Sequence, residues 1–139
     1  GLRLGYAMGQ RDLIEGLDRI KNSINSYTID RLGLAAAVKA IEDEDYFNNT
    51  RFKIINTRER ISGELVNIGF KVEESKANFI FISHRSLRAA DIFNQLKDRG
   101  VLVRYFNKPR IDNYLRVSIG SDEEMDVFLR VVSEIVAGR

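Results

Sequence analysis

The sequence predicts a mixed α/β chain, most of which forms an α+β sandwich with a small sheet packed against helices. Hydrophobic residues make up 44% and charged residues 30% of the 139 residues, an ordinary globular balance. Apolar residues recur at helical spacing before Gly69 and in short strand-like runs after it. From Phe70 onward the order is strand, strand, helix, strand, strand, helix, which is typical of such a sandwich.

The first part of the chain, residues 1–44, is predicted to form one strand and two helices that belong to a separate structural unit. Leu2–Met8 is an apolar run that predicts a short buried strand. Residues 10–23 carry apolar side chains at helical spacing. Asp30 is a plausible N-cap for a second helix that ends near residue 44 and is rich in alanine, which lets another element approach closely.

A long, highly charged helix is predicted over Asp45–Ile68, with Gly69 as the residue that ends it. A helix of this length and charge often connects two domains rather than lying in one core. We therefore predict a boundary near residue 44, with residues 45–139 forming the connecting helix and a small C-terminal domain.

The elements predicted after Gly69 are short. Ser86 is predicted to cap the next helix and Gly100 to end it. Ser121 and Glu124 have the spacing of a capping box at the start of the last helix. The predicted strands are Phe70–Glu73, Asn78–Ser83, Val101–Tyr105 and Tyr114–Ile119, and the predicted helices are Leu87–Arg99 and 122–137.

Composition excludes several functional classes. The chain has no cysteine, so disulfides, thiolate metal sites and cysteine nucleophiles are excluded. A net charge of +2 is too small to indicate nucleic acid or an anionic membrane surface. No run is apolar enough to span a bilayer and no signal-peptide pattern is present, so we expect a cytoplasmic protein. The acidic run Glu42–Asp45 lacks the ligand spacing of a calcium loop, and no metal site is predicted.

The opening of the chain is unusual. It does not begin with Met, and its first residues are apolar and strand-like. Natural N-termini more often begin with a polar, poorly ordered segment. We therefore expect a truncated or processed product.

Three arginines, Arg3, Arg104 and Arg116, lie in apolar strand-like segments. A guanidinium is costly to remove from water unless an anion meets it, although a strand can also turn such a side chain to solvent. Three cases in one chain favour an anionic ligand, and the spacing from Arg104 to Arg116 allows a loop and return into one cleft. His84 is the only histidine, and a surface or capping role is favoured over a catalytic one.

Five motifs lie in order along the chain: Gly1–Tyr6, Leu32–Asp43, Asn78–Phe79, Gly100–Arg104 and Leu115–Ser121. Together they resemble the fold-type I pyridoxal-phosphate-dependent aminotransferases, and most closely the histidinol-phosphate aminotransferase group. Each motif alone is only weakly specific, but their order and spacing are specific to this superfamily. Residues 27–30 depart from the pattern, because relatives often carry Asn at position 28 or 30.

The resemblance implies a role for each of the three arginines. Arg3 would contact the phosphate of the cofactor, pyridoxal 5'-phosphate. Arg116 would hold the carboxylate of the amino-acid substrate, and Arg104 would help hold the phosphate of histidinol phosphate. The implied reaction is amino transfer between histidinol phosphate and 2-oxoglutarate in histidine biosynthesis.

The resemblance also implies an organisation for the whole enzyme. Residues 1–44 would be the tail of the large cofactor-binding domain, and relatives are homodimers. The lysine that holds the cofactor as a Schiff base would lie a few residues before Gly1 and is absent from this sequence. The chain alone would therefore be inactive and would not bind the cofactor covalently.

Two alternatives remain open at this point. The first is a part of a threonine-phosphate decarboxylase or an aromatic-amino-acid aminotransferase, which resemble this group and reuse the carboxylate-binding arginine. The second is a non-catalytic α+β module that binds an anion or a protein. Such a module would have a normal core without an exposed apolar patch, whereas a part of a larger enzyme would expose Leu2, Leu4 and the alanine-rich helix.

Overall fold

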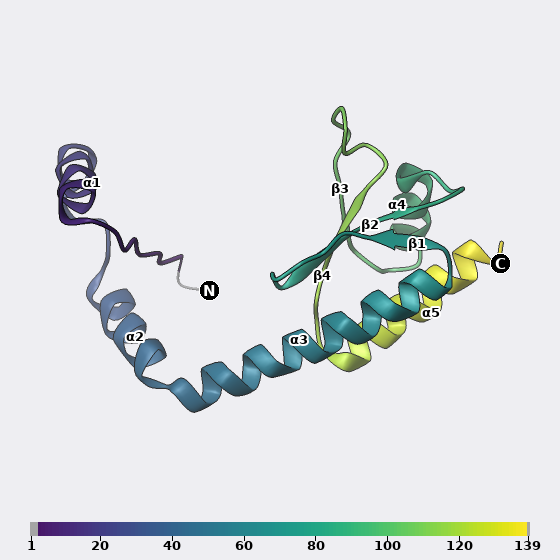
Figure 1. The fold of residues 1–139 in the computed structure, drawn as a ribbon, viewed down its shortest axis with the longest axis horizontal. Coiled ribbons are helices and arrows are strands. Elements are labelled where there is room, and N and C mark those ends of the chain that lie inside the picture. Colours follow the sequence, from purple (N-terminus) through teal and green to yellow (C-terminus); the bar gives the residue numbers. More distant parts are fainter. Residues whose placement is uncertain (1–2, 139) are drawn as a thin grey trace. The chain divides into compact units, whose positions relative to one another are not determined.

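The computed structural model describes residues 3–138 and divides the chain into two compact units (Figure 1). Unit 1 covers Gly1–Asn48 and unit 2 covers Asn49–Arg139. The helix α3, Glu44–Asn67, crosses from one unit to the other. Within the described residues, no helix is both long enough and apolar enough to cross a membrane.

Unit 1 contains the two predicted helices, α1 (Arg11–Ile24) and α2 (Arg31–Glu42). The prediction that Asp30 caps α2 is confirmed, because its carboxylate accepts a hydrogen bond of 2.7 Å from the backbone N–H of Gly33. Gly33 is the one buried residue of α2, and α1 has none. Unit 1 thus leaves most of its apolar side chains exposed, including Leu4, Leu13, Leu17, Ile20, Leu34 and Ile41.

The strand predicted over Leu2–Met8 is wrong for its described part, residues 3–8, which form no regular element. Leu2 lies outside the described residues. A strand is stable only when a neighbouring strand takes up its backbone hydrogen bonds, and the described part of unit 1 has no second strand. Arg3 also has a φ of 61°, in the left-handed region, which does not fit an extended strand.

The long helix α3 confirms the element predicted over Asp45–Ile68. Its C-terminal half enters unit 2, where Ile61 and Leu65 are fully buried. Two polar side chains of α3 contact the last helix. The hydroxyl of Thr57 donates a hydrogen bond of 2.8 Å to Asp122, and Arg60 pairs with Asp122 and Asp126. The Thr57 hydroxyl and the Arg60 guanidinium together lower the pKa of Asp122 below its ordinary value.

Gly69 ends α3 in the left-handed conformation, with a φ of 97°. A Cβ at this position would lie 3.0 Å from Nε2 of His84 and 3.1 Å from Nε of Arg85. We expect Gly69→Ala to lower the free energy of unfolding by about 2 kcal/mol, because strained backbone and crowding add to each other. Urea denaturation measures this loss. Gly63→Ala is the control, because Gly63 is an exposed helical residue of α3 with open space around it and should gain about 0.5–1 kcal/mol. A neutral or stabilising result for Gly69→Ala would contradict the expectation.

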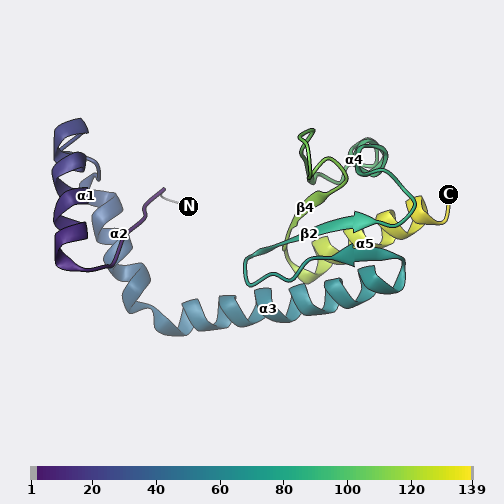
Figure 2. The ribbon, with the colours of Figure 1, turned by 45° about the horizontal axis from the view of Figure 1, so that its top comes forward.

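The sheet of unit 2 has four strands in the order β1-β2-β4-β3, and all neighbouring pairs are antiparallel. Figure 2 labels its two central strands, β2 and β4. The strands are β1 (Phe70–Val72), β2 (Phe79–His84), β3 (Arg104–Tyr105) and β4 (Leu115–Ser118). All four predicted strands of this unit are present, but the one predicted over Val101–Tyr105 keeps only its last two residues. The backbone N–H of Val101 instead donates to the carbonyl of Leu96 at 2.9 Å, which holds this segment at the end of the preceding helix.

Two further helices complete unit 2, α4 (Ala89–Asp98) and α5 (Asp122–Val136). The capping box of Ser121 and Glu124 at the start of α5 is confirmed. The prediction that Ser86 caps α4 is wrong, because the helix begins three residues later. The N–H of Ala89 donates instead to the side-chain oxygen of Asn113, at 3.0 Å, from the loop between β3 and β4.

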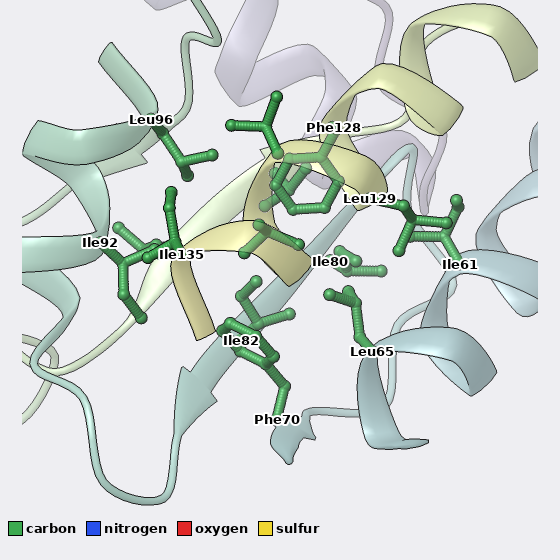
Figure 3. Packing of buried hydrophobic residues seen from close by; sticks show 14 of the residues in the cluster. Ile61, Leu65, Phe70, Ile80, Ile82, Ile92, Leu96, Phe128, Leu129 and Ile135 are labelled. Carbon is green, nitrogen blue, oxygen red and sulfur yellow. The ribbon is translucent and has the colours of Figure 1, made fainter. Parts of the chain in front are cut away.

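The core of unit 2 lies between one face of the sheet and the three helices α3, α4 and α5 (Figure 3). Side chains alternate along β2 and β4, so every second residue faces these helices. The core residues of β2 and β4 are Ile80, Ile82, Leu115 and Val117.

Candidate anion-binding site

The face of the sheet that points away from the helices carries arginine and aromatic side chains. Phe81 pairs with Arg116 across β2 and β4, and Phe79 pairs with Ser118. Arg116 and Ser118 are exposed, and Phe81 is half-buried. This face is the candidate site, because exposed arginines and aromatic groups gather there.

Arg104 and Arg116 are direct partners across the β3–β4 ladder. Both therefore project from the same face of the sheet. Like charges placed directly opposite each other destabilise an antiparallel pair. Within residues 3–138 neither guanidinium forms an ion pair with a carboxylate. An anion bound between the two groups would remove this repulsion.

The ring of Phe106 lies close to both arginines. Its centroid is 5.5 Å from Cζ of Arg104 and 5.8 Å from Cζ of Arg116. Arg116 also lies over Phe79, at 5.6 Å. Cations within about 6 Å of a ring centroid are attracted to the negative face of the ring. The two guanidiniums are therefore held by aromatic rings rather than by acids.

A row of aromatic rings continues from this point across the same face. Phe81 meets Phe106 edge-on at 6.4 Å and stacks on Tyr114 at 4.6 Å with an interplanar angle of 6°. The hydroxyl of Tyr114 donates a hydrogen bond of 3.0 Å to Glu73. Glu73 also pairs with Lys71. The contact with Lys71 is the larger cause, and that with Tyr114 the smaller, of a pKa of the Glu73 carboxyl below its ordinary value. The carboxylate of Glu73 thus binds Lys71 and Tyr114 rather than either arginine.

The chemistry of the arginine pair suits a phosphate or a carboxylate. Each guanidinium offers a planar set of donors that matches the oxygens of these anions, often through two parallel hydrogen bonds. Two adjacent guanidiniums carry a charge of +2, which complements a phosphate monoester dianion better than one carboxylate. The structure brings Arg104 and Arg116 together as register partners, and that they line one cleft stays a prediction. Their individual substrate roles stay predictions.

Arg3 belongs to unit 1, whereas the arginine pair belongs to unit 2. Its side chain is exposed, and it borders a largely apolar hollow of unit 1 together with Leu4, Ile29 and Leu34. It forms no ion pair within the described residues. Its predicted contact with a cofactor phosphate, and a pocket shared with Arg104 and Arg116, both stay predictions.

His84 is buried rather than at the surface, which corrects one of the two roles favoured for it. Its Nδ1 accepts hydrogen bonds from the backbone N–H groups of Leu87, at 3.1 Å, and Ser86, at 3.3 Å. Its Nε2 lies 3.3 Å from the carbonyl oxygen of Ile68. The other favoured role, helix capping, is not shown, because the N-cap of α4 is Arg88 and it has no side-chain cap bond. His84 instead orders the turn that precedes α4.

Sequence reasoning missed Phe79, Phe81, Phe106 and Tyr114 as members of the site. Phe106 follows Arg104 by two residues, the spacing that places side chains on one face of a strand. This signal was available in the sequence. The cross-strand neighbours of both arginines depend on the register of the sheet, which is not a local property.

The family profile described as aminotransferase class I and II matches residues 1–132. The chain belongs to the class I and II aminotransferases. Its mixed helices and small antiparallel sheet correspond to a part of that fold.

Relatives that resemble this chain carry the names of aminotransferases. A histidinol-phosphate aminotransferase of Clostridium acetobutylicum is 61% identical over 99% of this chain, and one of Brachyspira hyodysenteriae is 52% identical over 98%. The crystal structure of a histidinol-phosphate aminotransferase from Sinorhizobium meliloti, in complex with pyridoxal-5'-phosphate, superposes with a TM-score of 0.78 over 88% of this chain at 27% identity. The chain spans 39%, 38% and 35% of the length of these three aminotransferases, respectively.

Proposed function

We propose that this chain is the C-terminal, substrate-anion-binding part of an aminotransferase that acts on histidinol phosphate and 2-oxoglutarate. The observation that carries the proposal is the facing pair Arg104 and Arg116 on one face of the sheet, without an acidic partner in residues 3–138. The names of the relatives at 61% and 52% identity support this choice of substrate.

The two arginines would serve both substrates in turn. Histidinol phosphate carries its phosphate, and 2-oxoglutarate carries carboxylates, as the groups that a guanidinium fork can bind. We assign the phosphate of histidinol phosphate chiefly to Arg104, with Arg116 beside it. When 2-oxoglutarate is bound, we assign its carboxylate to Arg116. Holding these anions fixes the position of the rest of the substrate, which lowers the entropic part of the barrier to reaction.

Pyridoxal 5'-phosphate would supply the chemistry of this enzyme by acting as an electron sink for the substrate carbon. Arg3 fits the phosphate of this group, because it is an exposed guanidinium without an ion-pair partner in the described chain. The lysines of unit 1 are already committed within their helices: Lys21 pairs with Asp18 and Lys39 with Glu42. We therefore propose that covalent attachment of the cofactor needs a lysine from outside this sequence.

The alternative of a free-standing module is less well supported. Such a module would bury its apolar residues, yet Leu13 and Leu17 of α1 and Leu34 of α2 are exposed. Exposed apolar faces of this extent need another protein surface to cover them. The remainder of a larger enzyme and a second subunit both meet this need, so we include a homodimer in the proposal. The cytoplasmic location expected from the sequence is kept as a further part of the proposal. Leu2, the other residue of this comparison, lies outside the described residues.

A threonine-phosphate decarboxylase or an aromatic-amino-acid aminotransferase would also use Arg116 for a carboxylate. An aromatic amino acid, however, carries no phosphate for a second, adjacent guanidinium. The names of the relatives also favour histidinol phosphate over threonine phosphate. We therefore rank histidinol phosphate first.

A growth test examines this function. Cells that lack histidinol-phosphate aminotransferase are given the reading frame that contains this sequence, and we expect growth without histidine. Arg104→Ala and Arg116→Ala should each abolish or strongly slow this growth. Arg130→Ala is the matched control, because Arg130 is an exposed arginine of α5 that pairs with Glu134 outside the site.

Two outcomes of the growth test would contradict the proposal. One is failure of the unaltered reading frame to support growth although its protein is present at normal levels. The other is normal growth of both site variants. In a separate assay, the 139-residue chain with pyridoxal phosphate should form no glutamate from histidinol phosphate and 2-oxoglutarate, and turnover by this chain alone would refute the need for an outside lysine.

A further inference from the structure

Arg104 and Arg116 lie directly opposite each other without an acidic partner in the described chain. Two like charges on directly opposed strand positions repel each other, and a carboxylate between them would remove this repulsion but would also block an incoming anion. The described chain places no carboxylate there. Another group must hold the two guanidiniums in place before a ligand arrives.

We propose that Phe106 is the positioning residue of this site and that its ring holds both guanidiniums in the orientation that receives an anion. The inference rests on the proposed anion-binding role of Arg104 and Arg116. The ring lies within 5.5 Å and 5.8 Å of the two Cζ atoms, so it can attract both. Being uncharged, it attracts the cations without competing with the ligand for their hydrogen-bond donors.

The ring itself is fixed by its neighbours. Phe106 is half-buried, and its edge contact with Phe81 connects it to the stack of Phe81 on Tyr114. The hydroxyl of Tyr114 is held in turn by Glu73. The row therefore runs from a hydrogen-bonded anchor near β1 to the arginines at β3 and β4. Aromatic pairs in such edge and offset arrangements stabilise one another beyond their buried area.

Loss of the ring should weaken binding rather than abolish it. Without this ring Arg104 loses its aromatic contact and Arg116 keeps only that with Phe79. The two guanidiniums are then expected to move apart, and each binding event would have to order them again. Cation–π contacts at exposed sites contribute about 0.5–1 kcal/mol each, so losing both contacts corresponds to a loss of affinity of about fivefold or more. A ring with an equivalent face should preserve the affinity.

The test is a titration of the full 139-residue chain with inorganic phosphate, followed by NMR at constant ionic strength. We expect Phe106→Leu to raise the dissociation constant about fivefold or more and Phe106→Tyr to keep it within about twofold of the unaltered chain. Phe52→Leu is the matched control, since it removes the ring next to Arg51 on α3, a cation–π contact outside the site. This control should leave the affinity unchanged.

A second replacement separates positioning from folding. Pentafluorophenylalanine at position 106 keeps the shape of the ring but reverses the charge distribution of its face, so it should weaken binding as leucine does. Unfolding temperatures of all variants show whether the chain remains folded. A purely structural role would predict normal affinity for the fluorinated ring.

The outcomes distinguish this inference from the proposed function. If Arg104→Ala and Arg116→Ala weaken phosphate binding but leucine and the fluorinated ring at position 106 do not, the role of Phe106 is wrong and the anion site stands. If the two arginine variants also bind phosphate normally, the anion site itself is wrong. Weakening by both ring replacements with rescue by tyrosine supports the proposal.

Discussion

Replacing Arg116 with alanine is expected to weaken the binding of inorganic phosphate by about tenfold or more. The reason is that a hydrogen bond to a charged group contributes about 1.5–3 kcal/mol, and 1.4 kcal/mol corresponds to a factor of ten. Arg116→Lys should give an intermediate loss, since it keeps the charge but not the planar fork. A phosphate titration near pH 8, where the dianion predominates, measures the three dissociation constants.

The same substitution makes a second, opposite prediction for stability. Arg116 faces Arg104 across the ladder, so its removal relieves a like-charge contact. We expect Arg116→Ala to leave the unfolding temperature unchanged or to raise it slightly. Arg130→Ala, which breaks an exposed pair with Glu134, is the control for both measurements. A large drop in unfolding temperature without loss of phosphate affinity would identify Arg116 as a structural residue instead.

Ile82→Ala is expected to lower the free energy of unfolding by about 3–4 kcal/mol. Ile82 is fully buried between the sheet and the helices, and truncation of such a side chain loses its transfer free energy and leaves a cavity. Urea denaturation followed by circular dichroism measures the loss. The neighbouring Ser83→Ala, on the opposite face of β2, is the control and should cost less than about 1 kcal/mol.

A cost for Ile82→Ala as small as that for Ser83→Ala would contradict the assignment of the two faces of β2. It would mean that the face carrying Phe81 and Arg116 is the buried one. The site would then lie in the core, and its anion-binding role could not hold. This comparison therefore tests the fold that underlies the site.

The helices could be predicted from the sequence because their signals are local. Periodicity and caps such as Asp30 and the pair Ser121 and Glu124 placed the ends of all five helices within about two residues. The strand predictions were wrong where a segment forms a strand only if a neighbouring strand pairs with it. Residues 3–8 have the composition of a strand but no partner in the described part of unit 1, and Val101 is held by the end of α4.

The candidate site could be predicted in part for the same reason. Arg104 and Arg116 were identifiable because a charged side chain in an apolar strand is costly without an anion. Their direct opposition depends on the register between β3 and β4, which the spacing of twelve residues allows but does not specify. The role of Phe106 follows from that register, so it could be seen only with the ladder in place.

A double-mutant cycle on phosphate binding tests most directly whether Arg104 and Arg116 hold one anion together. Dissociation constants are measured for the unaltered 139-residue chain, Arg104→Ala, Arg116→Ala and the double variant. If both guanidiniums contact the same phosphate, the two losses should be coupled by about 1 kcal/mol or more. Losses that add within about 0.3–0.5 kcal/mol would show two independent arginines and contradict a shared anion site.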